Sequence, residues 1–212
     1  MATRIIKKPS IKIEVKDGKY KPFVFDNGKK RYLCDSDEPE PIEPTNRILY
    51  TVVEGGYKPE SSWITENCSD NIFDSDTGNG YLVLNEEVTE LVTYGEKIIP
   101  NIFNDDGDDS NIVTVVIPSQ ITSIGNNAFC FLYGLTSVTI PNSITSIGDS
   151  AFIDCSGLTS ITCFATTPPT LGTNAFDAIN TTTCIVPEAS IRAYEGSSWY
   201  NNPFTTFVAA DV

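Results

Sequence analysis

The chain of 212 residues contains an internal repeat, and this repeat limits what it can fold into. Residues 112–134 and 135–157 share 11 identities across 23 positions, concentrated in IPSQITSIGNNAF and IPNSITSIGDSAF. A third copy begins with LTSIT at Leu158 and returns as LGTNAF, with TTPP lengthening one of its turns. Units this short cannot bury their own apolar residues, so neighbouring copies must stack on one another. The sequence therefore predicts a solenoid.

The best-preserved copy indicates which residues form the solenoid core. Its expected inward residues are Leu135, Val138, Ile140, Ile144, Ile147, Phe152 and Leu158. The small residues Ala128, Ala151 and Ala175 leave room for the adjacent Phe129, Phe152 and Phe176. A glycine recurs in each copy, where either a side chain would crowd a neighbour or φ is positive: Gly125, Gly148 and Gly172.

The segment before the repeats shows weaker signals. EEVTEL at 86–91 matches the repeat at Val88 and Leu91, and a loop ten residues longer follows it. ILYTV and YLVL predict strands, Trp63 is an expected apolar anchor, and residues 76–80 predict a hairpin turn. Because the end of a solenoid exposes its core, we expect this segment to cap it.

The N-terminal region alternates between apolar and polar residues over 10–33, with turn residues at 17–18 and 26–28. This pattern predicts three short strands in a β-meander. Two or three strands alone are marginally stable in water, so docking or self-assembly is a natural role for this arm. Residues 34–46, CDSDEPEPIEPTN, contain three prolines and predict an extended linker.

Charge is divided unevenly along the chain. Residues 1–32 hold ten of the fourteen Lys and Arg and only three acids, a net charge of +7, whereas residues 33–212 hold four bases and 25 acids, a net charge of −21. Such an arm can dock on a negatively charged partner. The docking residues would be Lys7, Lys8, Lys12, Lys16, Lys19 and Lys21. Solvated lysines that discourage aggregation of strand edges are the alternative. Direct nucleic-acid binding is not expected, because the bases follow no recognition-helix pattern and the acidic body repels a polyanion.

The sequence gives little support to catalysis. It contains no histidine, the commonest general base and zinc ligand. No phosphate-binding glycine loop or nucleophile elbow is present, and the neighbouring acids Glu86 and Glu87 show no cleft. Acid-rich loops at 74–78 and 104–111 depart from calcium-loop spacing, which favours solvated loops over a calcium site. We expect no enzyme activity, no cofactor and no metal.

Six cysteines form no C-x-x-C pair. Buried free thiols are expected, with a Cys155–Cys163 disulfide as the alternative. The N-terminal MATRIIKKPSIKIEV has no continuous apolar stretch that would indicate a signal peptide, and no apolar run is long enough to span a bilayer. We therefore expect synthesis in the cytoplasm.

The unit LTSVTIPNSITSIGDSAFIDCSGL resembles the BspA-like class of bacterial leucine-rich repeats. The similarity continues through LTSITCFATTPPTLGTNAF and CIVPEASIRAYEGSSWY, which look like the final repeat and C-terminal cap of that family, and covers about residues 88–200. The resemblance implies a curved solenoid with short strands on one face and irregular turns on the other. It also implies surface display and binding of host or matrix proteins.

The predicted fold is mainly β: a short leucine-rich-repeat-like β-solenoid with a β-rich N-terminal arm and capping segments. The expected divisions are a docking arm at 1–33, a linker at 34–46, an N-terminal cap with a degenerate repeat at 47–111, and the solenoid with its C-terminal cap at 112–212. Outward residues of the aligned strands form a ladder on the presumed concave face, where solenoids often bind proteins. They are Thr114, Val116, Ser137, Thr139, Ser160 and Thr162. The alternative is that Thr simply suits exposed strand positions.

Two functional hypotheses follow. The first is a component displayed on a particle surface, such as a phage virion decoration or fibre-type protein, with the arm docked on a capsid or tail scaffold and the solenoid projecting to bind a host-surface ligand. The second is a secreted or cell-surface adhesin of the BspA-like kind. Both require a protein partner and no membrane insertion, and a homo-oligomer formed through the arm is also open.

Overall fold

The computed structural model describes residues 12–16, 19–26, 29–32, 46–54, 56–91, 101–103 and 111–210. Backbone contacts divide the chain into two units, one within residues 1–43 and the other within residues 44–211. Each unit has its own sheets and is described by itself. The functional argument rests on the second unit, whose side chains are described.

The first unit contains a three-stranded antiparallel sheet in the order β1-β2-β3. The strands are β1 (Lys12–Lys16), β2 (Lys19–Asp26) and β3 (Lys29–Tyr32). The register places Ile13 opposite Pro22 and Phe23 opposite Tyr32. The three strands predicted between residues 10 and 33 are therefore confirmed.

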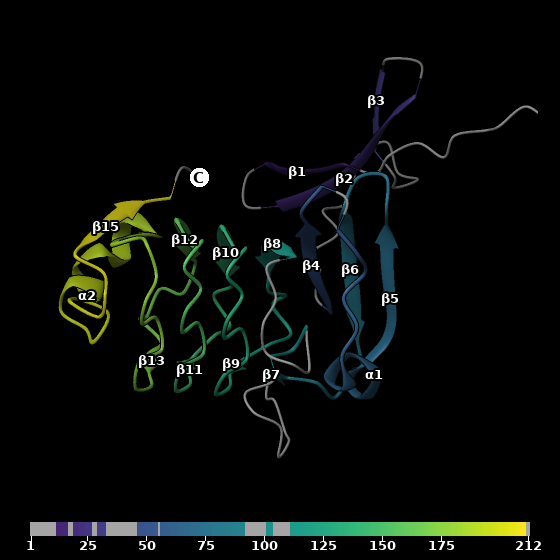
Figure 1. The fold of residues 1–212 in the computed structure, drawn as a ribbon. Helices are drawn as coiled ribbons and strands as arrows, with labels where there is room; N and C mark the ends of the chain where they lie inside the picture. The colour runs from purple at the N-terminus through teal and green to yellow at the C-terminus, as the bar shows by residue number, and fades with distance from the viewer. Residues whose placement is uncertain are drawn as a thin grey trace, which may run out of the picture. The chain divides into compact units, whose positions relative to one another are not determined.

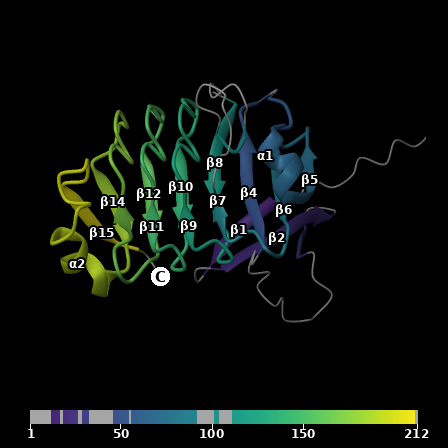
Figure 2. The same cartoon turned by 90° about the horizontal axis from the view of Figure 1, so that it is seen from below.

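The second unit is built on two sheets (Figures 1 and 2). The larger has the order β15-β14-β12-β10-β8-β4-β6-β5, and the smaller has the order β13-β11-β9-β7. The larger sheet contains β4 (Arg47–Val52), β5 (Cys68–Asp74), β6 (Asn79–Leu84), β8 (Ile112–Val116), β10 (Ser137–Ile140), β12 (Ser160–Cys163), β14 (Thr183–Val186) and β15 (Thr206–Ala209). The smaller contains β7 (Glu90–Leu91), β9 (Ser123–Ile124), β11 (Ser146–Ile147) and β13 (Thr170–Leu171). The fold is mainly β and solenoidal, as predicted.

The second sheet corrects one expectation. The resemblance implied strands on one face of the solenoid and irregular turns on the other, but each coil also contributes a two-residue strand to the smaller parallel sheet. The ITSI motif of the repeat supplies these strands, because its two Ile are buried and its Ser carries the ladder pairing with the next coil. Stacked coils thus form two hydrogen-bonded ladders.

The pairing follows the sequence repeat. In the larger sheet, residues 23 positions apart stand side by side: Thr114, Ser137, Ser160, Thr183 and Thr206. In the smaller sheet Leu91 pairs with Ile124, which confirms the degenerate copy and its longer loop. Ile147 pairs with Leu171, one residue further on than the repeat requires. The extra residue of the TTPP turn does not shift the larger sheet, which keeps its 23-residue spacing up to Thr183 and beyond.

The core lies between the two sheets. All seven inward residues predicted for the best copy are at most 1% exposed. Phe152 stacks on its equivalents in the neighbouring coils, with ring centroids 4.9 Å apart for Phe129 and Phe152 and 5.0 Å apart for Phe152 and Phe176. Phe103 continues this stack toward the N-terminus, 6.3 Å from Phe129. Apolar burial between coils is the main stabilising contribution, since a single coil has no core of its own.

Crowding, not positive φ, explains the repeat glycines Gly148 and Gly172. A Cβ on Gly148 would lie 2.7 Å from the Asn126 nitrogen and the Gly125 carbonyl carbon, and a Cβ on Gly172 would lie 2.5 Å from the corresponding carbon of Gly148. The left-handed backbone falls two residues later, on Asn127 and its equivalents. Polar side chains in these turns link the coils: the Asp149 N–H donates to Asn126 Oδ1 (2.8 Å) and the Thr173 N–H to Asp149 Oδ1 (2.6 Å).

The segment before the coils joins the larger sheet through β4, which is antiparallel to both β6 and β8. The predicted strands and hairpin are confirmed, with the turn at residues 75–78. Trp63 is buried as expected, but it lies on a short helix, α1 (Ser62–Asn67), that the sequence analysis did not predict. Ser61 caps this helix by accepting the Ile64 N–H at 3.1 Å.

The C-terminal end of the core is covered by η1 (Glu188–Ser190), α2 (Ile191–Glu195) and the aromatic residues that follow. Trp199 is fully buried and donates its indole N–H to the Pro169 carbonyl at 2.8 Å. The chain then forms β15, one repeat length after β14 and beyond the end of the family resemblance at about Tyr200. The cap is therefore inserted before the last strand of the sheet.

Candidate protein-interaction face

The larger sheet has one side toward the core and one side away from it, which we call the outer face. Strand residues alternate between the two sides: in β10, Val138 and Ile140 are buried, whereas Ser137 and Thr139 are half-buried. The same alternation holds in β12 and β14. The repeat therefore places equivalent side chains of every coil on the outer face.

In-register pairing gathers these side chains into two rows. The hydroxyl row consists of Thr51, Thr114, Ser137, Ser160, Thr183 and Thr206. The mixed row consists of Ile72, Tyr81, Leu49, Val116, Thr139, Thr162, Ile185 and Val208. The mixed row is apolar at both ends, where Ile72 and Val208 are 40% and 38% exposed, and polar in the middle.

The structure brings all six predicted binding residues together on this face. Thr114, Ser137 and Ser160 are neighbours in the hydroxyl row, and Val116, Thr139 and Thr162 are neighbours in the mixed row. All six are half-buried. Their role in binding remains a prediction.

Other threonines of the repeat have a different role. Thr136 precedes β10 and donates its hydroxyl to the Val113 carbonyl of the previous coil at 3.0 Å, and Thr159 donates likewise to Thr136 at 3.3 Å. Thr145 does the same at the other sheet, donating to the Thr122 carbonyl at 3.1 Å. These threonines join coils, so their abundance in the repeat has a structural cause separate from the outer face.

Charged groups lie at one end of the face. Asp70 and Asp74 of edge strand β5 share the side of Ile72, and the Arg47 guanidinium lies 4.8 Å from the centroid of the Tyr81 ring. The positions contributed by β8, β10, β12, β14 and β15 carry no charge. An uncharged, hydroxyl-rich surface with apolar ends is suited to contacts with another protein surface through hydrogen bonds and apolar packing.

Part of this face was not predicted from the sequence. Thr183 and Thr206 could have been found by extending the 23-residue spacing from Ser160. Leu49 and Thr51 belong to an antiparallel strand outside the repeat, so no periodic signal marked them. The Thr51 and Thr114 hydroxyl oxygens are hydrogen-bonded at 2.8 Å, which continues the hydroxyl row across the junction.

The predicted docking lysines fall in the first unit. Lys12 and Lys16 lie in β1, and Lys19 and Lys21 lie in β2, with Lys16 opposite Lys19 and Lys21 opposite Glu14. Lys7 and Lys8 lie outside the described residues. The docking role of these lysines remains a prediction.

The cysteines form no nucleophilic site among the described residues. All five of them are free, which makes the alternative of a Cys155–Cys163 disulfide wrong. The Cys155 thiol donates to the Phe129 carbonyl at 3.0 Å, and Cys163 Sγ accepts the Tyr194 hydroxyl at 3.2 Å. Burial raises the pKa of Cys68 and Cys130 to about 12, so these sulfurs stay protonated at neutral pH.

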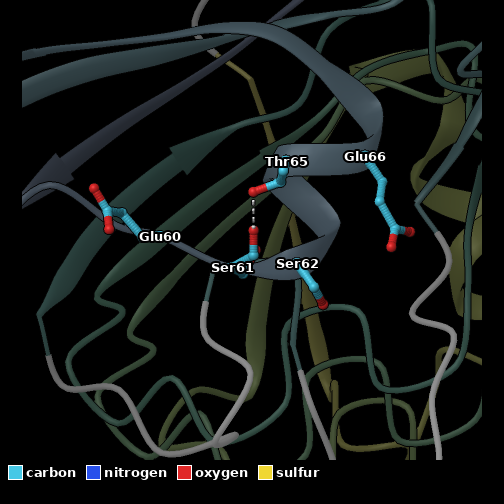
Figure 3. Close-up of a pocket in the computed structure, with 5 residues that line it drawn as sticks. All are labelled: Glu60, Ser61, Ser62, Thr65 and Glu66. Carbon is cyan, nitrogen blue, oxygen red and sulfur yellow. Dashed lines mark hydrogen bonds between the residues drawn. The ribbon is translucent and has the colours of Figure 1, made fainter.

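A shallow hollow of about 400 Å³ lies beside α1, lined by Glu60, Ser61, Ser62, Thr65 and Glu66 (Figure 3). Its polar groups serve the local fold: the Ser61 hydroxyl donates to the Ile102 carbonyl at 2.7 Å, and the Thr65 hydroxyl donates to the Ser61 carbonyl at 3.1 Å. Glu60 and Glu66 extend from opposite sides of it. The Ser61 and Thr65 hydroxyls are therefore engaged with backbone carbonyls.

One of the two acid-rich loops, at residues 74–78, lies within the described residues. In the 74–78 turn, the Asp74 carboxylate accepts the Asp76 N–H at 2.9 Å and so closes its own turn. Within the described ranges, no three His, Cys, Asp or Glu side chains gather in a metal-binding group. Residues 104–110, the core of the second acidic loop, lie outside the described residues. None of the helices that the structure describes is long and apolar enough to cross a bilayer.

Stacked coils joined by two parallel ladders, with a core that repeats from coil to coil, define a solenoid of short repeats. Residues 96–211 match the model of the BspA type leucine rich repeat region in six copies. Because this match covers more than half of the chain, the protein belongs to the BspA-type leucine-rich-repeat family. The match begins later than the predicted resemblance and extends through β15. Neither the search of curated proteins nor the search of solved structures gave a significant match.

Membership in this family indicates a protein-interaction or surface-adhesion role. Leucine-rich-repeat solenoids are typically non-enzymatic interaction scaffolds, and binding of proteins is the general role of their repeats. The outer face is the surface of the second unit on which this role can be tested residue by residue.

Proposed function

We propose that this protein is a non-catalytic component displayed on a particle surface, such as a phage virion decoration or fibre-type protein. The outer face of the larger sheet binds a protein partner on a host surface, and the basic arm attaches the chain to a capsid or tail scaffold. The observation that carries the proposal is the pair of in-register rows, which presents an uncharged surface over consecutive coils.

The division of charge supports a separate attachment role for the arm. Its net charge of +7 over residues 1–32 contrasts with −21 over the remainder, so an acidic scaffold attracts the arm and repels the body. Charged contacts of this kind affect the rate of association and the orientation of the partners more than the affinity of the complex. The arm and the outer face are therefore proposed to contact different partners.

A secreted or cell-surface adhesin is the second candidate, and family membership favours it. It uses the same outer face to bind host or matrix proteins but needs no particle. The two candidates differ in where the chain is found. Gradient sedimentation of native material separates them: migration with nucleic-acid-filled particles supports the first, migration with cell envelopes supports the second, and a free protein contradicts both.

The face itself is tested in the full chain by placing charge on its centre. Thr139→Arg with Thr162→Arg puts two long cations on the mixed row, where they should abolish retention of the chain on host-cell surfaces. Asn142→Arg with Thr166→Arg adds the same charge at exposed positions outside these strands and should leave retention unchanged. Equal retention by both double variants would show that the outer face is not the binding surface.

Attachment is tested by reversing charge on the arm. Lys12→Glu with Lys16→Glu should weaken co-sedimentation with the particle, most strongly at low ionic strength, since salt screens such contacts. Lys58→Glu with Arg192→Glu makes the same change of net charge in the second unit and should have no effect. If the two double variants co-sediment alike, the arm is not the attachment site.

A further inference from the structure

The strand β15 forms one edge of the larger sheet (Figure 1). Its neighbour is β14, and the parallel register runs over four pairs without a bulge, from Thr183 beside Thr206 to Val186 beside Ala209. Among the strands that the structure describes, none pairs with the other side of β15. This edge is therefore a place where another strand can add to the sheet.

The backbone groups that face outward can be identified from those that face β14. The Thr206 N–H donates to the Thr182 carbonyl at 3.1 Å, and the Ala210 N–H donates to the Val186 carbonyl at 2.9 Å. The backbone N–H and C=O groups of successive residues point to opposite edges of a strand. Those of Thr206, Val208 and Ala210 therefore point toward β14. The N–H and C=O groups of Phe207 and Ala209 consequently point away from the sheet.

The two edges of the larger sheet are protected to different degrees. The opposite edge strand, β5, contains Asp70 and Asp74 on the outer face and has a bulge between Cys68 and Asp70. Charges and bulges of this kind hinder the pairing of edge strands between molecules. β15, with the sequence TFVA, has neither charge nor proline, and its Val208 is 38% exposed. Only β5 carries the features that prevent edge-to-edge association.

The distribution of charge allows a second copy of this chain to occupy the β15 edge, whereas it opposes a second copy at the β5 edge. Residues 46–91, which include β5, contain nine acids and two bases, whereas residues 183–210 contain two acids and one base. Copies that met through β5 would bring their acidic segments together. Copies that meet through β15 keep those segments at the far ends of the joined sheet, so the repulsion is smallest.

We propose that two copies of the chain associate through β15, with the strands antiparallel and centred on Val208. In this register Phe207 of each copy lies opposite Ala209 of the other, and the outward N–H and C=O groups form four hydrogen bonds. The two Val208 residues face each other as a non-hydrogen-bonded pair on the outer face, where facing Cα atoms are about 4.5 Å apart. The outer faces of both copies then form one continuous surface around a twofold axis.

The register gives a specific cross-linking test in the full chain. Val208→Cys places two thiols within disulfide distance across the twofold axis, because disulfides form between Cα atoms about 4.4–6.8 Å apart. Thr206→Cys is the matched control: it lies on the same face of the same strand, but the two copies of this residue are separated by about 13 Å along the strands. Under mild oxidation, V208C should give several-fold more covalent dimer than T206C. The unmodified chain measures any cross-linking through its own cysteines.

A second measurement tests association without a new cysteine. Ala209→Pro removes an outward N–H that the fold does not use, and proline is tolerated on edge strands when its missing donor faces solvent. Sedimentation equilibrium should show the unmodified chain approaching twice the monomer mass as concentration rises, and A209P remaining monomeric. Val208→Lys should also remain monomeric, because a charge on an edge strand hinders pairing with another strand. Its melting temperature should be unchanged.

Either of two results would overturn the proposal. The first is equal covalent dimer from V208C and T206C. The second is a mass that does not fall in A209P or V208K, which would mean that any association uses another surface, such as the arm. Neither result depends on whether the outer face binds a host protein, because no partner is present in these experiments.

Discussion

The parallel coils and the antiparallel segment before them contribute to one sheet but achieve burial differently. In the coils, each core side chain packs on its equivalent 23 residues away, as in the stack of Phe129, Phe152 and Phe176. In the antiparallel segment, burial depends on cross-strand neighbours and polar links: the Tyr50 hydroxyl donates to Asn71 Oδ1, and Asn71 Nδ2 donates to the Pro59 carbonyl, both at 2.8 Å. In the coils, the repeat determines which side chains pack together. In the antiparallel segment, specific cross-strand and polar contacts determine it.

Charge separates the same two regions. Residues 46–91 contain nine acids and two bases, whereas the longer stretch of residues 112–210 contains five acids and one base. A stacked repeat brings equivalent residues together, so an acid repeated at one position would face its own copy in the next coil. The antiparallel segment has no such constraint. The acidic residues are accordingly concentrated in the segment before the coils, where equivalent residues do not stack on one another.

The largest expected effect is the loss of a ring inside the aromatic stack. Phe152→Ala removes a fully buried ring with neighbours at 4.9 and 5.0 Å, so the free energy of unfolding should fall by about 3–5 kcal/mol. Phe103→Ala, at the junction with the antiparallel segment, has neighbours at 5.7 and 6.3 Å and should cost less. Urea denaturation of both variants measures the difference. Equal losses would show that periodic stacking adds nothing beyond burial.

The second effect concerns crowded glycines. Gly148→Ala pushes a Cβ against backbone atoms of the preceding coil, whereas in Gly80→Ala the crowding atoms belong to the Tyr50 ring. Each substitution should cost about 1–3 kcal/mol. The Gly80 loss should be partly recovered by adding Tyr50→Leu, which removes the obstructing atoms. The Gly148 loss should not be recovered by adding Asn126→Ala, because the backbone contact remains.

Two double-mutant cycles from chemical denaturation measure these couplings, and Gly196→Ala provides the control. A Cβ at Gly196 would have its nearest neighbour at 3.5 Å, an ordinary contact, so this variant should change stability little. Strong coupling at Gly148 and Asn126 would mean that the coils tolerate crowding by side-chain movement. The proposed contrast between backbone and side-chain crowding would then be wrong.

A third effect appears in alkaline solution. Burial raises the pKa of the Cys130 thiol from its ordinary value of about 9 to about 12. Between pH 9 and pH 12 the unfolded chain releases the Cys130 proton, whereas the native chain keeps it. The contribution of this thiol to the free energy of unfolding is therefore complete below pH 9 and is lost as pH rises toward 12. The slope is about 1.4 kcal/mol per pH unit for one fully protected thiol. Cys130→Ala should therefore flatten the fall of stability above pH 9.

Cys68 tests the same effect in the antiparallel segment. Burial also raises the pKa of this thiol to about 12, but the residue is half-buried, so solvent moderates the effect. Cys68→Ala should flatten the alkaline curve less than Cys130→Ala. Thermal melts of the two variants and the unmodified chain from pH 8 to pH 11 provide the comparison, and a larger effect at Cys68 would contradict it.

The same contrast explains what could be predicted from the sequence. The repeat located the coil core down to individual residues such as Ile140 and Leu158, because a stacked unit repeats its burial pattern. It also located six residues of the outer face. It did not show that ITSI forms a second ladder, because two-residue strands have no alternation of their own.

The remaining misses lie where the repeat ends. Helix α1 is only six residues long and follows its cap Ser61, a signal too short to separate from a turn. Strand β15 follows an inserted cap, and only its spacing from β14 identifies it. Leu49 and Thr51 reach the outer face through antiparallel pairing with β8, which depends on contacts distant in sequence.

The smallest expected effect is a gain, and it again separates the two regions. Ser150 has φ +54° in a coil turn, a conformation that costs a residue with a Cβ about 1–2 kcal/mol. Ser150→Gly removes this cost and adds about 0.5–1 kcal/mol of backbone entropy loss, so stability should rise by about 0.5 kcal/mol. In the antiparallel segment the left-handed position is already a glycine, Gly78 at φ +68°, and Gly78→Ala should lower stability. Opposite signs in urea denaturation would show that the coils, unlike the segment, retain turn positions that glycine can improve. A loss at both sites would mean that the Ser150 side chain stabilises its turn by more than its backbone strain costs.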